Sequence, residues 1–265
     1  MICPHCHTEI PDDSRLCSVC GNNVAAARSA AQTAGNAALL LGAAAREARL
    51  RAQVSEDQLL DERTYNSVLL GVLLWGVLIN LLLCVYVGDV YRYIHPVAFL
   101  IGYMACAFAG ILIAGRSRNP AVSFLGYNLV VVPLGLVIST LVALYGGVGS
   151  RVVADAFMYT LFITLGMTAA ALIWPNLFAR LGGALLGVLC GLVLCELALL
   201  FLRREQAITD WIAAGLFSLY IGYDVYRSQQ FPRTVDNAVD CALDIYLDLA
   251  NLFIRLLSIL GRRRK

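Results

Sequence analysis

Residues 67–87 read SVLLGVLLWGVLINLLLCVYV, an apolar run without a single charged residue. A run of about 20 apolar residues is long enough to cross the hydrocarbon core of a bilayer as an α-helix. Six further, largely apolar runs of similar length follow, at residues 95–115, 121–145, 152–174, 181–202, 207–226 and 239–260. We therefore predict an all-α fold in which residues 66–265 form a bundle of seven transmembrane helices in a lipid bilayer.

The overall composition agrees with a membrane protein. Of 265 residues, 60% are hydrophobic and only 14% are charged, and the mean hydropathy is +0.73. A soluble globular domain is closer to half apolar and a quarter charged. The composition thus excludes a single soluble domain, a disordered chain and a secreted disulfide scaffold. The net charge of +2 is too small to indicate nucleic-acid binding.

The N-terminus carries two C-x-x-C pairs, CPHC and CSVC, formed by Cys3, Cys6, Cys17 and Cys20. Two such pairs separated by a short loop are typical of a tetrahedral thiolate zinc site. Two disulfides or a redox-active pair are the alternatives. We predict that residues 1–24 form a zinc ribbon, in which four thiolates fill the coordination sphere and the metal has a structural role.

A stretch rich in alanine, arginine and glutamate, residues 25–65, connects the ribbon to the bundle. We predict a partly helical linker that acts as a tether, or that lies on the membrane surface or mediates self-association. Zinc-binding thiolates require a reducing compartment, so we place the N-terminus in the cytoplasm. The arginine-only basic charge before Lys265 and the ribbon type favour a multi-pass protein of a bacterial inner membrane.

Aspartates interrupt the last two apolar runs, among them Asp224 in the sixth, and Asp240, Asp244 and Asp248 in the seventh. A spacing of four residues places the last three along one face of a helix, and Asn251 follows on the same side. Ionisable side chains are costly in lipid, so this face is expected to line the bundle interior or water. Glu196, a single acid in the fifth run, is weaker evidence for a site.

Two aspartates on adjacent helices can form one site. If Asp224 and Asp248 approach within hydrogen-bond distance, both cannot easily ionise, and the pair titrates as a unit. Such a dyad can hold a proton, a metal cation, or both in competition. Calcium needs several oxygen ligands, to which Asp244 and Asn251 could contribute. The alternative is a purely structural pair that locks the last two helices together, together with Arg116.

The segments LFSLYIGYD (216–224) and ALDIYLDLANLFIRLLSILG (242–261), together with the seven runs, resemble the Bax inhibitor-1 family. The resemblance extends over residues 66–262 and leaves out the ribbon and the linker. It implies a seven-helix membrane bundle with a central last helix. It also implies a pH-sensitive calcium leak, with Ca²⁺ as the permeant or bound ion.

The resemblance also implies roles for individual residues. The two-aspartate sensor of the family falls on Asp224 and Asp248. An arginine after the second helix, which pairs with the dyad in the closed state, corresponds to Arg116 or to Arg118. Asp155 matches the acid that precedes Ala-Phe at the start of the fourth span.

We therefore predict a pH-sensitive cation leak channel or transporter, and not an enzyme. Asp244 stands where bacterial members more often have a small polar residue, which adds a charge beside the dyad. An intramembrane aspartyl protease is the catalytic alternative, but its Gly-x-Gly-Asp element is absent around Asp248. A membrane-embedded regulator of membrane protein quality control is the other alternative, with the zinc ribbon docking a protein partner.

Overall fold

The computed structural model describes residues 46–52, 58–202 and 207–262. The chain divides into two compact units, residues 1–50 and 51–265. In the first unit the described residues, 46–50, are helical, and the partly helical linker stays a prediction. The predicted zinc ribbon lies outside the described residues. The second unit is the helical bundle.

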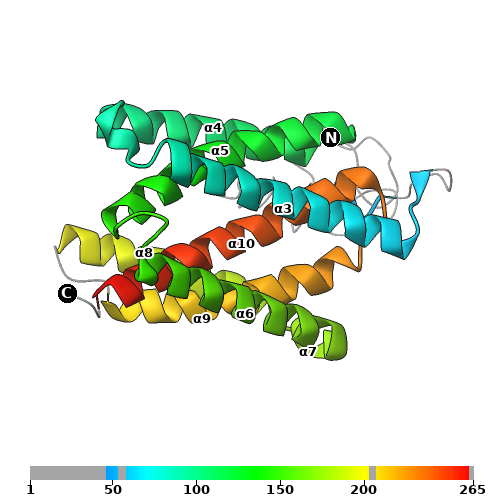
Figure 1. Ribbon diagram of the computed structural model, residues 1–265. Helices are drawn as coiled ribbons and strands as arrows, with labels where there is room; N and C mark the ends of the chain where they lie inside the picture. The colour runs from blue at the N-terminus through cyan, green and yellow to red at the C-terminus, as the bar shows by residue number, and fades with distance from the viewer. Residues whose placement is uncertain (1–45, 53–57, 203–206, 263–265) are drawn as a thin grey trace, which may run out of the picture. The chain divides into compact units, whose positions relative to one another are not determined.

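Every regular element in the described part of the chain is a helix, and no strand occurs there, which confirms the all-α prediction (Figure 1). In chain order the elements are α3 (Glu62–Tyr86), η3 (Val90–Arg92), α4 (Pro96–Arg116), α5 (Pro120–Leu144), α6 (Arg151–Ile173), α7 (Pro175–Phe178), α8 (Gly182–Phe201), α9 (Ala207–Ser228) and α10 (Val235–Arg262). Each predicted apolar run coincides with one long helix to within a few residues.

Helix α3 begins five residues before the predicted run because Asp61 caps it. The Asp61 carboxylate accepts a hydrogen bond from the backbone N–H of Thr64 (3.1 Å), which satisfies one of the free N–H groups of the first turn. Hydrogen bonding at Thr64 also lowers the pKa of Asp61. The first turn is polar, so the hydropathy of the sequence did not mark it as part of the helix. Helix α10 likewise begins four residues before the predicted run.

Five helices of the described residues, α3, α4, α5, α6 and α8, are long and apolar enough to cross a membrane. The protein is thus a multi-pass membrane protein. Helices α9 and α10 carry more charge and fall outside this group. Their crossing of the bilayer, and hence the count of seven spans, stays a prediction.

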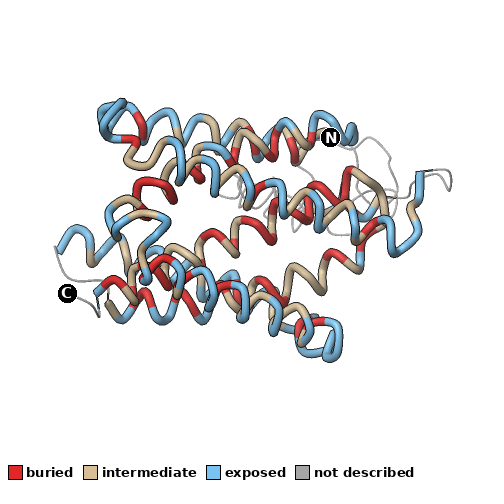
Figure 2. Tube along the Cα trace, viewed as in Figure 1, coloured by how far each residue is buried: buried red, intermediate tan, exposed pale blue. Residues whose placement is uncertain are grey.

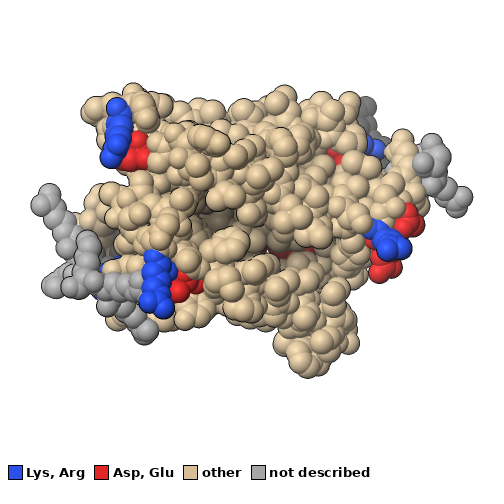
Figure 3. Space-filling model, in the orientation of Figure 1, with Lys and Arg blue, Asp and Glu red and all other residues tan. Residues whose placement is uncertain are grey.

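The exterior of the bundle suits lipid. Large apolar side chains such as Leu74 on α3, Ile101 on α4 and Leu194 on α8 are exposed. On the face seen in Figure 3, almost all charged residues lie toward the two ends, and the middle is nearly free of them. A helix in a bilayer can expose such a surface because its own hydrogen bonds satisfy the backbone.

Helix α10 occupies the centre of the bundle. It packs against α9, α3, α6 and α5, while α3, α4 and α5 pack together on one side and α6, α8 and α9 on the other (Figure 1). Most of the α10 surface is buried (Figure 2). A central last helix is what the family resemblance implied.

Polar side chains in the spans find partners on neighbouring helices. The Tyr246 hydroxyl of α10 hydrogen-bonds with the amide of Asn80 on α3 (2.8 and 3.0 Å), and the Tyr127 hydroxyl of α5 donates to the carbonyl of Val72 (2.9 Å). Both rings press against Gly76, where an added Cβ would lie 2.2 Å from the Tyr127 hydroxyl oxygen. Gly76 thus permits α3, α5 and α10 to meet.

We expect Gly76→Ala to destabilise the bundle by about 1–3 kcal/mol, because the buried tyrosines cannot move without cost. Gly71→Ala on the same helix is the matched control, since nothing lies within 4 Å of its added Cβ. The measurement is the thermal unfolding midpoint of both variants in detergent. Equal midpoints would contradict the packing role of Gly76.

Candidate functional site

Asp248 lies at the middle of α10 and is buried, with only 8% of its surface exposed. Asp224 of α9 lies close enough to hydrogen-bond to it and to interact with its charge. The second carboxyl oxygen of Asp248, Oδ2, is buried and has no hydrogen-bond partner in the described part of the chain. The structure therefore brings together the two aspartates that the sequence singled out.

The local sequence explains how the two carboxyls meet. Helices α9 and α10 are consecutive, run antiparallel and pack along their length. Gly222, two residues before Asp224, has Phe178 so close that an added Cβ would lie 2.3 Å from its ring. The glycine thus lets α7 approach α9 closely, half a turn before Asp224 along the helix.

Asp244 lies one turn before Asp248 on α10 and is half-buried. Its carboxylate is 3.8 Å from a guanidinium nitrogen of Arg227 on α9, and the guanidinium of Arg227 in turn lies over the ring of Phe231 (5.3 Å). Arg227 therefore provides a positive charge next to the dyad, a role that the sequence had not suggested for it.

The acidic face of α10 continues toward its N-terminal end. Asp240 is fully buried and Asp236 accepts a hydrogen bond from the hydroxyl of Ser123 on α5 (2.6 Å). Asn251 follows the dyad, and its amide donates to the carbonyl of Leu247 in the same helix (2.8 Å). The predicted stripe, from Asp240 to Asn251, thus faces the bundle interior as expected.

Three other predicted site residues lie outside α9 and α10, the helices that carry the dyad. Arg116 is exposed at the C-terminal end of α4 and forms no ion pair with described residues. Arg118 follows in the exposed link to α5. Asp155 is half-buried in the N-terminal part of α6. Their participation in the site stays a prediction.

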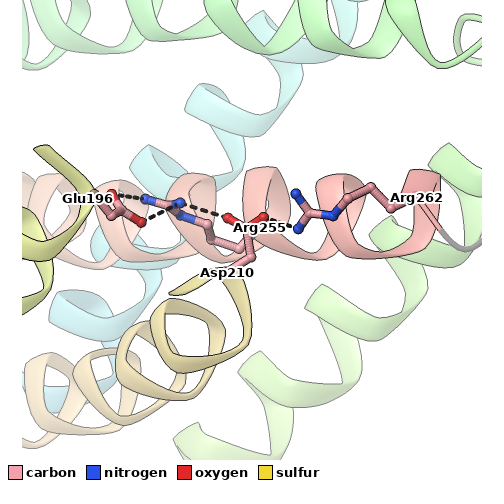
Figure 4. Close-up of polar contacts among 4 residues, drawn as sticks. All are labelled: Glu196, Asp210, Arg255 and Arg262. Atoms are coloured by element: carbon pink, nitrogen blue, oxygen red, sulfur yellow. Dashed lines mark hydrogen bonds and ion pairs between the residues drawn. The ribbon is translucent and has the colours of Figure 1, made fainter. Parts of the chain in front are cut away.

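Sequence reasoning missed an ion-pair cluster formed by Glu196 of α8, Asp210 of α9, and Arg255 and Arg262 of α10 (Figure 4). Asp210 stands in the first turn of α9 and bonds to both arginines. A glutamate and an arginine inside separate apolar runs were the available signal. Their meeting depends on how α8 and α10 both pack against α9, which hydropathy does not report.

In the described part of the chain, no group of three or more histidine, cysteine, aspartate or glutamate side chains is arranged to hold a metal ion. The predicted zinc ligands, Cys3, Cys6, Cys17 and Cys20, lie outside it. Four thiolates in two C-x-x-C pairs nevertheless match the donor set that zinc prefers.

Comparison with known proteins decides the family. The family described as inhibitor of apoptosis-promoting Bax1 matches residues 57–265. The chain belongs to this Bax inhibitor family. A zinc-ribbon domain family matches residues 2–24, which supports zinc binding by the N-terminal cysteines.

Individual relatives match about half of this chain. Bax inhibitor 1 of Schizosaccharomyces pombe is 32% identical over 131 residues, 48% of this chain and 47% of that protein. An uncharacterized protein of Helicobacter pylori is 36% identical over 132 residues, 46% and 55% of the two chains. A Golgi anti-apoptotic protein of vaccinia virus is 31% identical over 112 residues, 42% and 47%. The chain thus spans about half the length of these relatives.

We expect the purified chain to carry about one zinc ion, because four thiolates complete one tetrahedral site. Replacing Cys3 and Cys17 together by serine should abolish it, as measured by elemental analysis after gel filtration. Cys190→Ser with Cys195→Ser is the matched control, because both cysteines are exposed on α8. Zinc retained without Cys3 and Cys17 would refute the ribbon ligands.

Proposed function

We propose that this Bax inhibitor family protein is a pH-sensitive cation leak channel or transporter, with Ca²⁺ as its ion, gated by Asp224 and Asp248. One observation supports this most directly: the two carboxyls pair at the middle of the central helix, and Asp248 keeps a buried oxygen, Oδ2, without a hydrogen-bond partner among the described residues. A proton or a cation would satisfy that oxygen.

The chemistry of gating follows from the charge of the pair. Two adjacent carboxyls in a poorly solvated site share a proton at low pH, because two negative charges repel each other there. When pH rises and the shared proton leaves, the charge of the pair goes from minus one to minus two. The affinity for a cation then increases, and the balance between two packings of α9 and α10 shifts.

Arg227 and Asp244 adjust the balance between the two packings of α9 and α10. The guanidinium of Arg227 lies near Asp244, one turn from the dyad, and offsets its charge. We propose that Arg227 supplies part of the role expected of Arg116, holding the acidic face in the closed arrangement. Asp155, Asn251 and Arg118 stay candidates for supporting roles.

We expect calcium flux into dye-loaded proteoliposomes to change several-fold between pH 5 and pH 8, and Asp224→Asn or Asp248→Asn to flatten this dependence. An amide cannot exchange the proton, so the site no longer changes charge. Asp61→Asn is the matched control, because asparagine caps a helix as well as aspartate does. Absence of flux at every pH, with folded protein confirmed by circular dichroism, would refute the leak function.

The second candidate function is regulatory, and the zinc-ribbon match at residues 2–24 favours it. Small ribbons dock protein partners, and this one sits outside the family region. We propose that it faces the cytoplasm of a bacterium, from a bundle in the inner membrane, where its thiolates stay reduced. The two functions can coexist in one chain, and neither makes it an enzyme.

Deletion of residues 1–24 separates the two functions. A leak channel should keep its proteoliposome flux and still complement a strain that lacks the gene. A docking regulator should keep its flux, if any, and lose complementation, because its partner is no longer bound. The Cys3→Ser, Cys17→Ser variant in the full chain should behave like the deletion if the folded, zinc-bound ribbon is what the partner recognises.

A further inference from the structure

The polar face of α10 changes sign along its length. Asp244 and Asp248 are followed by Asn251, and then, one turn later, by Arg255. Seven residues separate Asp248 from Arg255, which is two turns, so both lie on one side of the helix about 10 Å apart along its axis. The acidic residues that run from the N-terminal end of α10 to the dyad are therefore followed by an arginine on the same side of the helix.

Arg255 is held by carboxylates from two other helices. Its Nη1 lies 2.8 Å from Asp210 Oδ1 of α9 and 2.7 Å from Glu196 Oε1 of α8, and its Nη2 donates to Glu196 Oε2 (2.8 Å). This two-pronged geometry on Glu196 is the arrangement in which arginine binds carboxylate most firmly. The guanidinium thus ties α8, α9 and α10 together at one point (Figure 4).

The cluster is sheltered and electrically balanced. The side chain of Asp210 is 5% exposed, and those of Arg255 and Glu196 are each 19% exposed. Arg262 lies two turns after Arg255 on α10, and its guanidinium bonds to the other carboxylate oxygen of Asp210. Among the described residues this cluster holds two acids and two arginines, in contrast to the acidic part of the face around the dyad.

We propose that Arg255 closes the polar face of α10 on the far side of the dyad and acts as a second gate. Its ion pairs with Glu196 and Asp210 must break before a cation can pass from Asp248 to the other end of the bundle. When Arg255 withdraws, Glu196 and Asp210 face one remaining arginine, Arg262, and the passage gains a negative charge. This inference rests on the proposed leak function.

The gate and the pH sensor are separate in this arrangement. The dyad changes charge when it exchanges a proton, whereas Arg255 stays charged at every physiological pH. Loss of Arg255 should therefore raise the rate of flux without moving the pH at which the flux changes. If Arg255 had a merely structural role, its loss would lower the stability of the protein without raising the rate of flux at a constant pH midpoint.

The test measures calcium flux in proteoliposomes with the full chain from pH 5 to pH 8. We expect Arg255→Gln to raise the flux about tenfold, since removing one partner of a sheltered ion pair shifts an equilibrium by at least that factor, while the pH midpoint stays in place. Arg255→Lys should give an intermediate flux, because lysine keeps the charge but cannot bind both carboxylates with a planar fork.

Arg233→Gln is the matched control. Arg233 also forms an ion pair, with Glu62 (2.9 Å), but both side chains are well exposed, and Arg233 precedes α10 in the chain. Its flux should equal that of the native protein. Thermal unfolding of each variant in detergent establishes that the comparison is made on folded protein.

The outcomes distinguish the gate from the function on which it rests. Native protein that leaks, with Arg255→Gln leaking at the same rate, overturns the gate and leaves the leak function standing. A raised flux whose pH midpoint moves together with the rate also overturns it, because Arg255 then acts through the dyad. No flux from native protein or any variant overturns the leak function itself.

Discussion

Carboxylates on α10 must be kept out of lipid, and the arrangement of the other helices follows from that constraint. An aspartate at the centre of a bilayer costs about 3 kcal/mol even where the membrane adapts around it, and Asp240, Asp244 and Asp248 lie on one helix. The bundle avoids this cost by placing α10 between two groups of apolar helices. The least apolar of the long helices is thus the most buried one.

The pairing of α9 with α10 distributes charge in a definite order. From the C-terminal end of α9 backward, Arg227 first faces Asp244 of α10, and Asp224 then faces Asp248. Near the start of α9, Asp210 faces Arg262. These pairs follow one antiparallel register. Along this register the acid–acid pair lies between two pairs of acid and arginine.

The structure also separates the part of the chain that determines the family from the part that is added to it. The Bax inhibitor match begins at residue 57, and the bundle begins at Glu62. The zinc-ribbon match ends at residue 24. The region that belongs to the family and the region that matches a zinc ribbon therefore do not overlap along the chain.

The sequence by itself determined where the helices lie and pointed to Asp224 and Asp248, because apolar runs and the spacing of aspartates are local properties of the chain. The sequence did not predict the helix starts at Glu62 and Val235, since capping and tertiary burial set them rather than hydropathy. Only the tertiary structure decided that Arg227 stands beside Asp244 and that Arg255 joins Glu196 to Asp210. Those contacts link residues up to 59 positions apart, and which side of each helix faces its neighbour is settled by the packing of all the helices around α10.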